Sequence, residues 1–302
     1  MLIDDICIHR KKDVVKPTIS SDFQPVLNST PPNLKRLWKN LALPGSLLSN
    51  YLSGDESSEE ESLITFFESC RGGWANLGKV VTPSLCQSIE EESRGQDENP
   101  VWLDQRRGRI TASIAHQVLH CTTGQKGLVD LILGRKTFLG NRHTIYGKTH
   151  ESLARSLFRE RFFREHRNAK MWETGLIVNA ATPHFGASPD AMVSCSCHGT
   201  GVIEIKCPST GAEKTLEEYV ALKNDVALDE NGNLKLLTGK WYTQIQMQLA
   251  LTKANFGEFV LYLGIAPYLH HCTVHLDDQE WEIAQEKLTS FFQSHVLPEI
   301  CP

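Results

Sequence analysis

The segment GVIEIKCP constrains the fold more than any other part of this chain. Side chains alternate between the two faces of a strand, so Ile203, Ile205 and Cys207 face one way, whereas Glu204 and Lys206 face the other. The apolar residues are typical of a strand in the middle of a sheet. A carboxylate and an ammonium two residues apart on such a strand indicate either a cross-strand ion pair or half of a functional site.

The bulk composition is that of a globular protein. The chain has 302 residues, of which 40% are hydrophobic and 22% are charged. This length is enough for one large domain with an appendage, or for two modest domains. No apolar run is long enough to span a bilayer, and the start, MLIDDICIHRKKD, has acids where a secretory signal would be apolar. These features predict an intracellular location, nuclear in a eukaryote, with no signal peptide and no membrane partner.

Charge is distributed unevenly along the chain. The net charge is −5, but residues 51–100 hold eleven acidic and three basic residues, a balance of −8. Residues 101–175 hold fourteen basic and six acidic residues, a balance of +8. A solvated helical surface explains such a segment in most proteins. The asymmetry nevertheless leaves a basic segment able to face phosphates, which the whole-chain charge conceals.

Hydrophobic periodicity predicts a mixed α/β fold. Helical patterns occupy residues 34–43, 63–70, 112–120, 127–134, 146–163, 241–254 and 278–294. Extended patterns occupy residues 174–180, 184–194, 201–207, 257–264 and 270–277, and the first three predict consecutive antiparallel strands. This order describes a mixed sheet flanked by helices on both faces. Residues 1–95 form a partly flexible region of unknown role, and residues 96–302 form the domain.

A third charged residue accompanies the Glu204 and Lys206 pair. Asp190 follows Pro189, and a proline is excluded from a regular central ladder, so the chain is expected to bend there. Pairing through the turn at 195–200 would bring Asp190 beside Glu204. Two adjacent carboxylates repel each other unless a cation compensates, and Mg²⁺ or Mn²⁺ suits an oxygen-only site. The alternative is a surface ion pair with Asp190 merely turning the chain.

Five blocks of sequence carry a resemblance to a known family. They are WLDQRRGRITAS, YGKTHESLAR, FGASPDAMV, GVIEIKCP and YTQIQMQLALT, which span residues 102–252 in this order. Their order resembles that of the PD-(D/E)XK nuclease superfamily, and more closely its lambda exonuclease and YqaJ viral recombinase branch. The resemblance implies a restriction-endonuclease-like fold. One departure is Ala191, where the family often has glycine after the motif aspartate.

The resemblance also implies roles for individual residues. It implies a metal site formed by Asp190, Glu204, Ile205 and Glu151. Lys206 is then similar to the residue that positions or activates the attacking water. Gln244 and Gln246 lie in the family's glutamine-rich helix, and one of them is expected to orient the water or the groups of the site.

Three further residues are similar to those of a pocket for a DNA 5′-phosphate. Arg106 resembles the arginine that grips this phosphate, Ser113 resembles a hydroxyl contact, and Arg107 competes with Arg106 for the same role. A guanidinium suits this task because its planar fork binds phosphate bidentately.

The function that the resemblance implies is metal-dependent DNA hydrolysis. The expected activity is that of a 5′-to-3′ exonuclease on duplex ends, linked to recombination or a mobile element. Expected partners are duplex DNA ends, a single-strand annealing or recombinase protein, and further copies of the chain. The alternatives are an endonuclease of repair or restriction type, and an inactive DNA-binding protein of the same fold.

The turn CSCHG, at residues 195–199, is rich in metal-ligand side chains. Cys195, Cys197 and His198, with Cys207, are candidates for a structural zinc site, but C-x-C-H lacks the usual spacing and a clear second pair. The nine cysteines are an odd number at irregular spacing and do not suggest a disulfide framework. A turn with free thiols is therefore favoured over zinc.

Overall fold

The computed structural model describes residues 81–136 and 140–300, all within one compact unit. Its helical elements are α4 (Pro83–Glu92), η2 (Gln96–Glu98), α5 (Pro100–Arg106), α6 (Ala112–Leu119), α7 (Gln125–Ile132), α8 (Arg142–Glu165), η3 (Ser209–Gly211), α9 (Leu216–Val220), α10 (Lys240–Thr252), α11 (Asp278–Phe291), η4 (Phe292–Val296) and α12 (Leu297–Ile300). Its strands are β1 (Ile110–Thr111), β2 (Lys170–Trp172), β3 (Ile177–Asn179), β4 (Thr182–Ala187), β5 (Ala191–Cys195), β6 (Gly199–Lys206), β7 (Val226–Leu228), β8 (Leu234–Leu236), β9 (Phe256–Tyr262) and β10 (Leu269–Val274). The helices predicted at 34–43 and 63–70, and residues 1–80 of the partly flexible region predicted at 1–95, lie outside the described residues.

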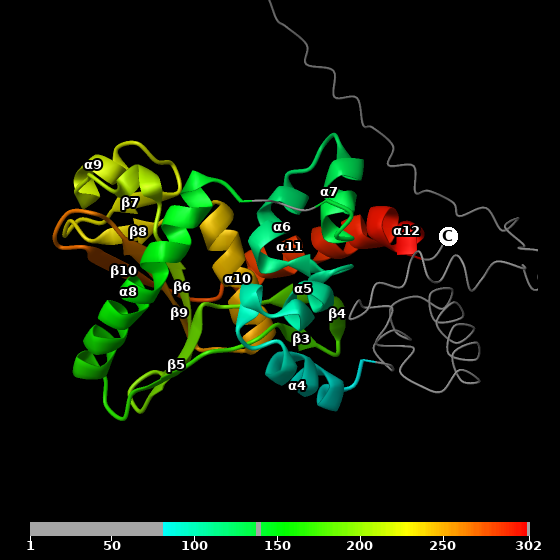
Figure 1. The fold of residues 1–302 in the computed structure, drawn as a ribbon, viewed down its shortest axis with the longest axis horizontal. Helices are drawn as coiled ribbons and strands as arrows, with labels where there is room; N and C mark the ends of the chain where they lie inside the picture. Colours follow the sequence, from blue (N-terminus) through cyan, green and yellow to red (C-terminus); the bar gives the residue numbers. More distant parts are fainter. Residues whose placement is uncertain (1–80, 137–139, 301–302) are drawn as a thin grey trace, which may run out of the picture. The chain divides into compact units, whose positions relative to one another are not determined.

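A five-stranded mixed sheet forms the centre of the described fold (Figure 1). Its strand order is β10-β9-β6-β5-β2, in which β6 and β9 are parallel and the other neighbours are antiparallel. The predicted α/β architecture is confirmed. Because β6 has a partner on each side, its backbone is bonded in two ladders and its side chains lie within the molecule.

Two helices cover the two faces of this sheet. On one face α8 places Phe158 and Phe162, four residues apart, against Ile203 and Ile205 of β6. On the other face the residues of α10 pack against Val202 and its neighbours in β9. The alternation predicted for β6 therefore separates two apolar clusters. Asn141 caps the start of α8, and its side chain accepts hydrogen bonds from the first-turn amides.

The predicted strand at 184–194 is wrong as a single element. It divides into β4, which pairs with β1 and β3, and β5, which pairs with β6 in the central sheet. The division falls at Ser188, Pro189 and Asp190, where proline has no amide hydrogen to donate to a ladder. The bend leaves Asp190 at the beginning of the β5–β6 hairpin, which positions it for the site described below.

Helix α4 is fastened to the chain that follows β2. The amide of Leu176 donates to Ser93 Oγ at 2.7 Å, and the amide of Gly175 donates to Glu90 Oε1 at 3.1 Å. A β-carbon on Gly175 would overlap the backbone carbonyl of Glu90, so only glycine permits this approach. The boundary between residues 95 and 96 remains a prediction. Within the described residues, no helix has the length and apolar character needed to cross a bilayer.

Candidate active site

The β5–β6 hairpin brings Asp190 and Glu204 to the same place. The amide of Asp190 donates to the carbonyl of Ile203 at 3.0 Å, which extends the ladder past the first residue of β5. The Asp190 carboxylate then accepts a hydrogen bond from the amide of Ile205 at 2.5 Å. Glu204, which lies between Ile203 and Ile205 in β6, is 1% exposed. Pairing through the turn was predicted, and the register of the hairpin agrees with it.

Three side chains donate to the buried carboxylate of Glu204. Lys206 Nζ and Gln244 Nε2 both donate to Glu204 Oε1, the glutamine at 2.6 Å. Gln248 Nε2 donates to Glu204 Oε2 at 2.5 Å. A buried carboxylate is stable only when its oxygens are paired, and here both oxygens are. Lys206 remains 26% exposed, so the ion pair joins the buried carboxylate to the edge of the site.

The two predicted glutamines of α10 do not lie together. Gln246 turns away, where its Nε2 donates to the carbonyl of His275 at 2.9 Å and its Oε1 accepts from the amide of Asp277 at 2.8 Å. Positions two apart lie on opposite sides of a helix, whereas Gln244 and Gln248, four apart, share one side. The sequence left open which of Gln244 and Gln246 serves the site, and these contacts favour Gln244. The i, i+4 spacing was the signal for Gln248.

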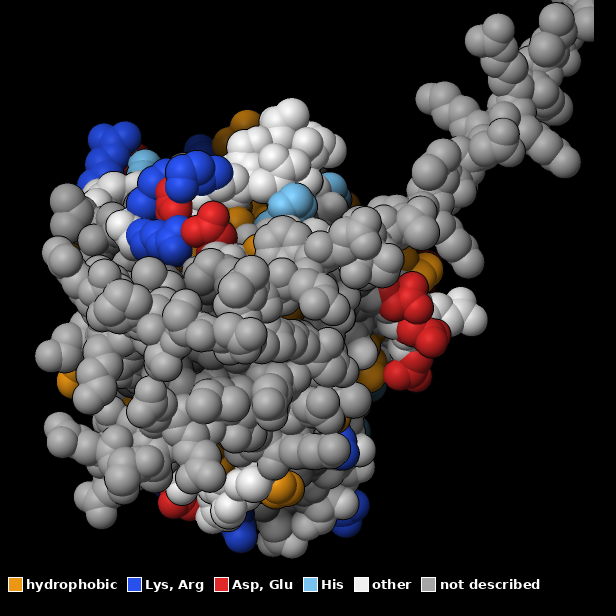
Figure 2. Space-filling model, turned by 90° about the vertical axis from the view of Figure 1, so that its right-hand side faces the viewer, with side chains coloured by type: hydrophobic (Ala, Val, Ile, Leu, Met, Phe, Trp, Pro, Cys, Tyr) orange, Lys and Arg blue, Asp and Glu red, His pale blue; other side chains and the backbone are white. Residues whose placement is uncertain are grey.

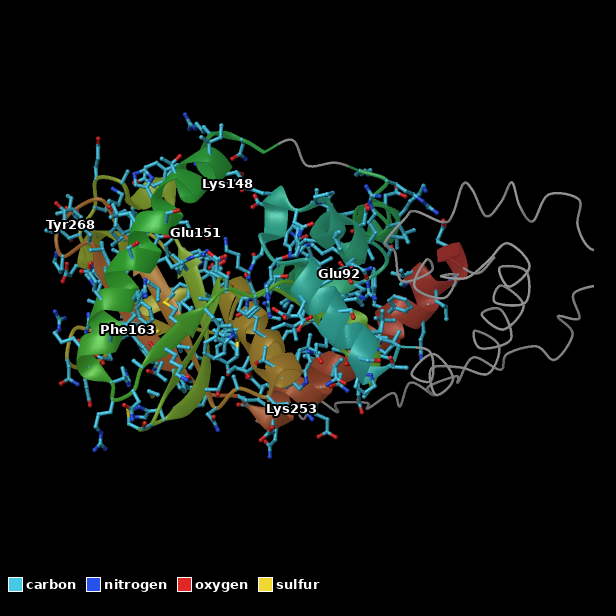
Figure 3. All side chains as sticks on the ribbon, turned by 60° about the horizontal axis from the view of Figure 1, so that its bottom comes forward. Glu92, Lys148, Glu151, Phe163, Lys253 and Tyr268 are labelled. Carbon is cyan, nitrogen blue, oxygen red and sulfur yellow. The ribbon has the colours of Figure 1, made fainter. Side chains whose placement is uncertain are left out.

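Glu151 reaches the same region from α8. It lines a cleft of about 450 Å³ together with Asp190, Trp102 and Arg155. The Glu151 carboxylate accepts a hydrogen bond from Arg155 at 2.8 Å, and Arg155 also bonds Glu173 at 2.9 Å. Figure 3 shows α8, which carries Glu151, toward the left of the view, and α4, which ends at Glu92, to its right. The helix thus adds a third carboxylate to the group formed by the hairpin.

The electrostatics of this group favour a bound cation. Burial raises the pKa of Asp190 well above its usual value, and the neighbouring Glu204 and Glu151 raise it further. Burial opposes the charge on Lys206, but Glu204 and Asp190 outweigh this effect and raise its pKa. Carboxylates that resist joint ionisation accept a divalent cation readily. The donor set consists of oxygens, which suits a hard ion such as Mg²⁺ or Mn²⁺.

Arg106 lies in a second cleft, of about 540 Å³, beside the first. Its Nη2 donates to Thr111 Oγ1 at 3.3 Å and to Ser113 Oγ at 3.1 Å, and its guanidinium lies 4.0 Å from the centre of the Trp102 ring. Burial lowers the pKa of Arg106 to about 10, which leaves it charged at neutral pH. Within residues 81–136 and 140–300, Arg106 has no carboxylate partner. Its charge therefore remains available to an anion.

Arg107 is engaged differently. Its Nη1 lies 2.8 Å from Asp104 Oδ1, three residues earlier on α5. Both arginines line the second cleft, but only Arg106 shares the hydroxyl group of Ser113. Of the two residues that competed in the sequence, Arg106 has the surroundings suited to an anion. Trp102 and Lys148 line both clefts, so the clefts adjoin each other.

The described surface carries its charges in separate groups. On the face drawn in Figure 2, Lys and Arg side chains gather at the upper left around a few acidic groups, whereas the group at the right is acidic. Charges of opposite sign are therefore not evenly mixed on this face. The net charge of −5 alone does not describe this separation of basic and acidic groups on the surface.

Cys207 lies apart from the other predicted zinc ligands. It directly follows β6, where it is buried among the residues beneath α8, whereas Cys195, Cys197 and His198 all precede that strand. Eight residues of strand separate points by about 26 Å, too far for one metal ion. Burial raises the pKa of Cys207 to about 12. Including Cys207 in the zinc group was therefore wrong.

Comparison with known proteins identifies relatives of this chain. Residues 101–255, just over half of the chain, match the profile of the YqaJ-like viral recombinase domain. The alkaline nuclease of human herpesvirus 7 is 27% identical over 154 residues, which cover 50% of this chain and 30% of that protein. The chain thus aligns with less than a third of this curated relative's length.

Two solved structures share the fold. The structure of LHK-Exo, an alkaline exonuclease from Laribacter hongkongensis, in complex with dAMP is 23% identical, with a TM-score of 0.52 over 66% of this chain and 93% of that one. The shutoff and exonuclease protein of Kaposi's sarcoma-associated herpesvirus is 11% identical, with a TM-score of 0.53 over 90% of each chain. Both structures are of the restriction-endonuclease-like type, which confirms the predicted fold.

Proposed function

The chain belongs to the YqaJ-like viral recombinase domain family, and we propose that it is a metal-dependent deoxyribonuclease acting from duplex ends. The observation that carries this proposal is the buried carboxylate of Glu204, held by Lys206 and two glutamines beside Asp190. A chain that needed only a stable sheet would gain nothing from a buried charge supported by three donors. The arrangement instead suits a site that must hold a cation against a phosphate.

Asp190, Glu204 and Glu151 are the side chains that would hold the metal, together with the backbone of Ile205. Their oxygens suit Mg²⁺, and Mn²⁺ has the same ligand preference. When bound, the ion supplies electrostatic stabilisation of the negative charge that develops on the phosphate. Its affinity should depend on Gln244 and Gln248, because donors that fix a ligating carboxylate also fix its orientation.

Lys206 is the group that we assign to the nucleophile. Its ammonium lies at the edge of the cleft, is bonded to Glu204, and stays charged because nearby carboxylates raise its pKa. A charged ammonium can donate hydrogen bonds to a water and to a phosphate oxygen, which fixes the direction of attack. Lys206 therefore positions water and phosphate and does not act as a base.

Arg106 is the residue that we assign to a terminal 5′-phosphate. Within the described part of the chain its guanidinium hydrogen-bonds only to the hydroxyls of Thr111 and Ser113, and a phosphate can replace or join these partners. Because the two clefts adjoin at Trp102, a strand end held by Arg106 leads toward Asp190. This arrangement supports the proposed preference for ends over internal sites.

The first expected result concerns the form of the DNA. With Mg²⁺, the full chain should degrade linear duplex with a 5′-phosphate, should degrade the 5′-hydroxyl duplex about 10- to 100-fold more slowly, and should leave closed circular duplex intact. Gel analysis of end-labelled duplexes measures this. Arg106→Ala should abolish the preference for phosphate, whereas Arg107→Ala, which loses only a surface pair with Asp104, should retain it.

The alternatives give different outcomes. Cleavage of the closed circle at the linear rate would indicate an endonuclease, and binding of every DNA form with no cleavage would indicate an inactive DNA-binding protein. Equal preference for phosphate in the wild type and in Arg106→Ala would remove the assignment of Arg106 alone. A single-strand annealing or recombinase partner, and self-association, remain predictions.

A second expected result separates the glutamines of α10. Gln248→Leu should lower cleavage about 10- to 100-fold at limiting Mg²⁺, because Glu204 Oε2 loses its donor. The matched variant, Gln246→Leu, should keep its activity but lose about 1–3 kcal/mol of unfolding free energy, because two backbone groups lose their partner. Mg²⁺ titration and denaturant unfolding of both variants test this. The assignment is wrong if Gln246→Leu loses as much activity as Gln248→Leu.

A further inference from the structure

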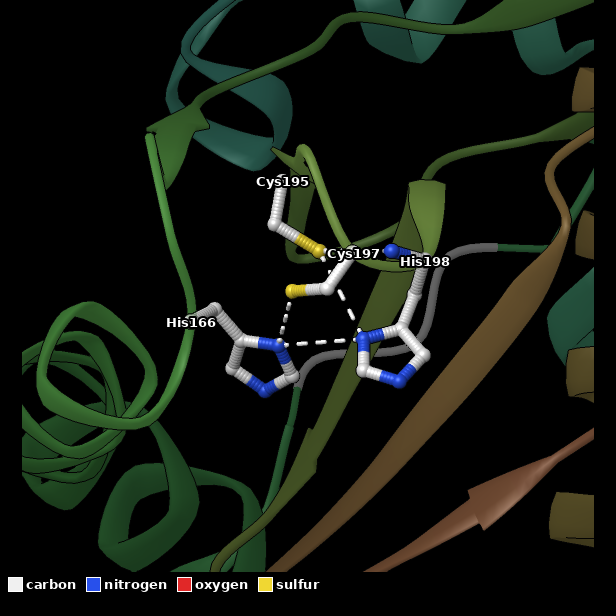
Figure 4. A group of neighbouring side chains, drawn as sticks. All are labelled: His166, Cys195, Cys197 and His198. Carbon is white, nitrogen blue, oxygen red and sulfur yellow. Dashed lines mark hydrogen bonds between the residues drawn. The ribbon is translucent and has the colours of Figure 1, made fainter.

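A group of four metal-ligand side chains lies at the far end of the β5–β6 hairpin from Asp190. Cys195 ends β5, Cys197 and His198 form the turn, and His166 directly follows the last residue of α8 (Figure 4). Their ligand atoms all lie within 4.8 Å of one another. Two thiols and two imidazoles from separate parts of the chain thus converge on one point. His166 is 29 residues before Cys195, so the turn's own sequence could not indicate it.

The distances within the group match the edges of a tetrahedron. Four ligands around zinc at its usual bond lengths would place two nitrogens about 3.3 Å apart, and a nitrogen and a sulfur about 3.6 Å apart. The two Nδ1 atoms of His166 and His198 are 3.2 Å apart. Cys197 Sγ is 3.4 Å from His166 Nδ1, and Cys195 Sγ is 3.7 Å from His198 Nδ1. Three edges therefore have the lengths that a shared zinc ion would require.

Backbone contacts hold the group in this arrangement. Gly199 has a φ of +84°, a left-handed conformation that glycine adopts without strain and that turns the chain directly after His198. The amide of His198 donates to Cys195 Sγ at 3.3 Å. The amide of Ser196 donates to the carbonyl of Arg167 at 2.9 Å, which ties the turn to the chain beyond α8. An aromatic contact orients His166, whose ring stacks on Phe162 at 4.1 Å.

We propose that Cys195 Sγ, Cys197 Sγ, His166 Nδ1 and His198 Nδ1 bind one structural zinc ion. Tetrahedral sites with two sulfurs and two nitrogens are typical of zinc, and a site with four protein ligands has no position left for a substrate. The site is distinct in chemistry from the carboxylates around Glu204, which suit a hard ion. It stands independently of the proposed nuclease activity.

The zinc would join α8 to the hairpin. Glu151 lies on α8, and Asp190 and Glu204 lie on the hairpin. The ion would therefore fix the two elements that together bring these three carboxylates to the cleft. Glu151 lies on α8 and His166 directly follows its last residue, fifteen residues later, which is a separation of about 22 Å at the rise of a helix. The ion therefore acts at a distance from the cleft, by holding the elements that carry its residues.

Metal content of the purified full chain tests the proposal. The experiment uses the Asp190→Asn variant as its background, so that zinc does not bind at the carboxylates of Glu204 and Glu151. For this variant, after dialysis against a weak chelator, we expect mass spectrometry to find one zinc ion per chain. Cys197→Ser and His166→Ala should each lose at least about nine-tenths of this zinc, since each removes one ligand of four. Cys121→Ser, which changes a cysteine outside the group, should keep it all. Zinc-free wild type, or equal zinc in all four proteins, would overturn the proposal.

The absorption spectrum of the Co²⁺-loaded protein distinguishes a variant that has lost a ligand from one that has misfolded. The chain loaded with Co²⁺ should have the intense visible bands of a tetrahedral site and thiolate-to-cobalt absorption in the near ultraviolet. Cys197→His keeps four ligands and should retain the visible bands with about half of the thiolate absorption. Weak octahedral bands in the wild type, or a disulfide joining Cys195 to Cys197 in freshly purified protein, would show that the four side chains do not form a zinc site.

Discussion

Asp190→Asn is expected to lower the rate of DNA cleavage about a thousandfold or more while leaving the protein folded. The asparagine oxygen can still accept the hydrogen bond from Ile205, so the hairpin keeps its geometry. The substitution removes the charge that the metal needs, and a metal that stabilises phosphate charge contributes several kcal/mol. It also relieves the repulsion with Glu204 and Glu151, so the melting temperature in chelator should not fall.

Single-turnover cleavage of a 5′-phosphorylated linear duplex at saturating Mg²⁺ measures this effect. The matched control is Asp278→Asn, which changes an exposed aspartate on α11 outside both clefts and should retain full activity. Retention of more than a tenth of the wild-type rate by the folded Asp190→Asn protein would remove Asp190 from the metal site.

Lys206→Ala is expected to lower the turnover rate by about 10²- to 10³-fold, the range for loss of one hydrogen-bond donor directed at charge that develops in the transition state. The substitution removes the ammonium that orients water and phosphate. It also leaves the buried carboxylate of Glu204 with only its two neutral donors. Breaking a buried ion pair is strongly destabilising, so unfolding free energy in the absence of metal should fall as well.

Turnover measured over a range of Mg²⁺ concentrations separates these effects. Added Mg²⁺ should restore stability to Lys206→Ala but not its rate, because the ion cannot replace the positioned ammonium. Lys148→Ala provides the comparison, since Lys148 lines both clefts but pairs with Asp97 at the surface. Its effect should be a few-fold and should shrink in salt. Full recovery of the Lys206→Ala rate in Mg²⁺ would contradict the role assigned to Lys206.

The parts of the site that could be predicted depend on short-range geometry. Alternation along a strand places Glu204 and Lys206 on one face, and the structure has them bonded there. A proline before Asp190 predicts the bend, although it did not reveal that β4 and β5 belong to different sheets. Both inferences use rules that act over one to four residues, which a sequence displays directly.

The parts that were missed depend on packing between distant elements. The four-residue spacing places Gln248 on the same side of α10 as Gln244, but only packing determines that this side of the helix faces β6. His166 lies beside Cys195, Cys197 and His198 because α8 ends next to the β5–β6 turn. No local sequence pattern encodes this contact. By contrast, the sequence could distinguish Arg106 from Arg107. Asp104 precedes Arg107 by three residues, a spacing at which helical side chains meet, and the two form an ion pair.

The position of α8 along its own axis has a consequence for tolerance to mutation. A shift of one residue along the axis would move Glu151 by about 1.5 Å, whereas metal-ligand distances vary by about 0.2 Å. His166, stacked on Phe162 and lying beside Cys197, opposes such a shift from the end of the helix remote from the cleft. Substitutions at the far end of α8 should therefore impair the proposed activity through misalignment, although they touch neither the DNA nor the ion of the proposed active site.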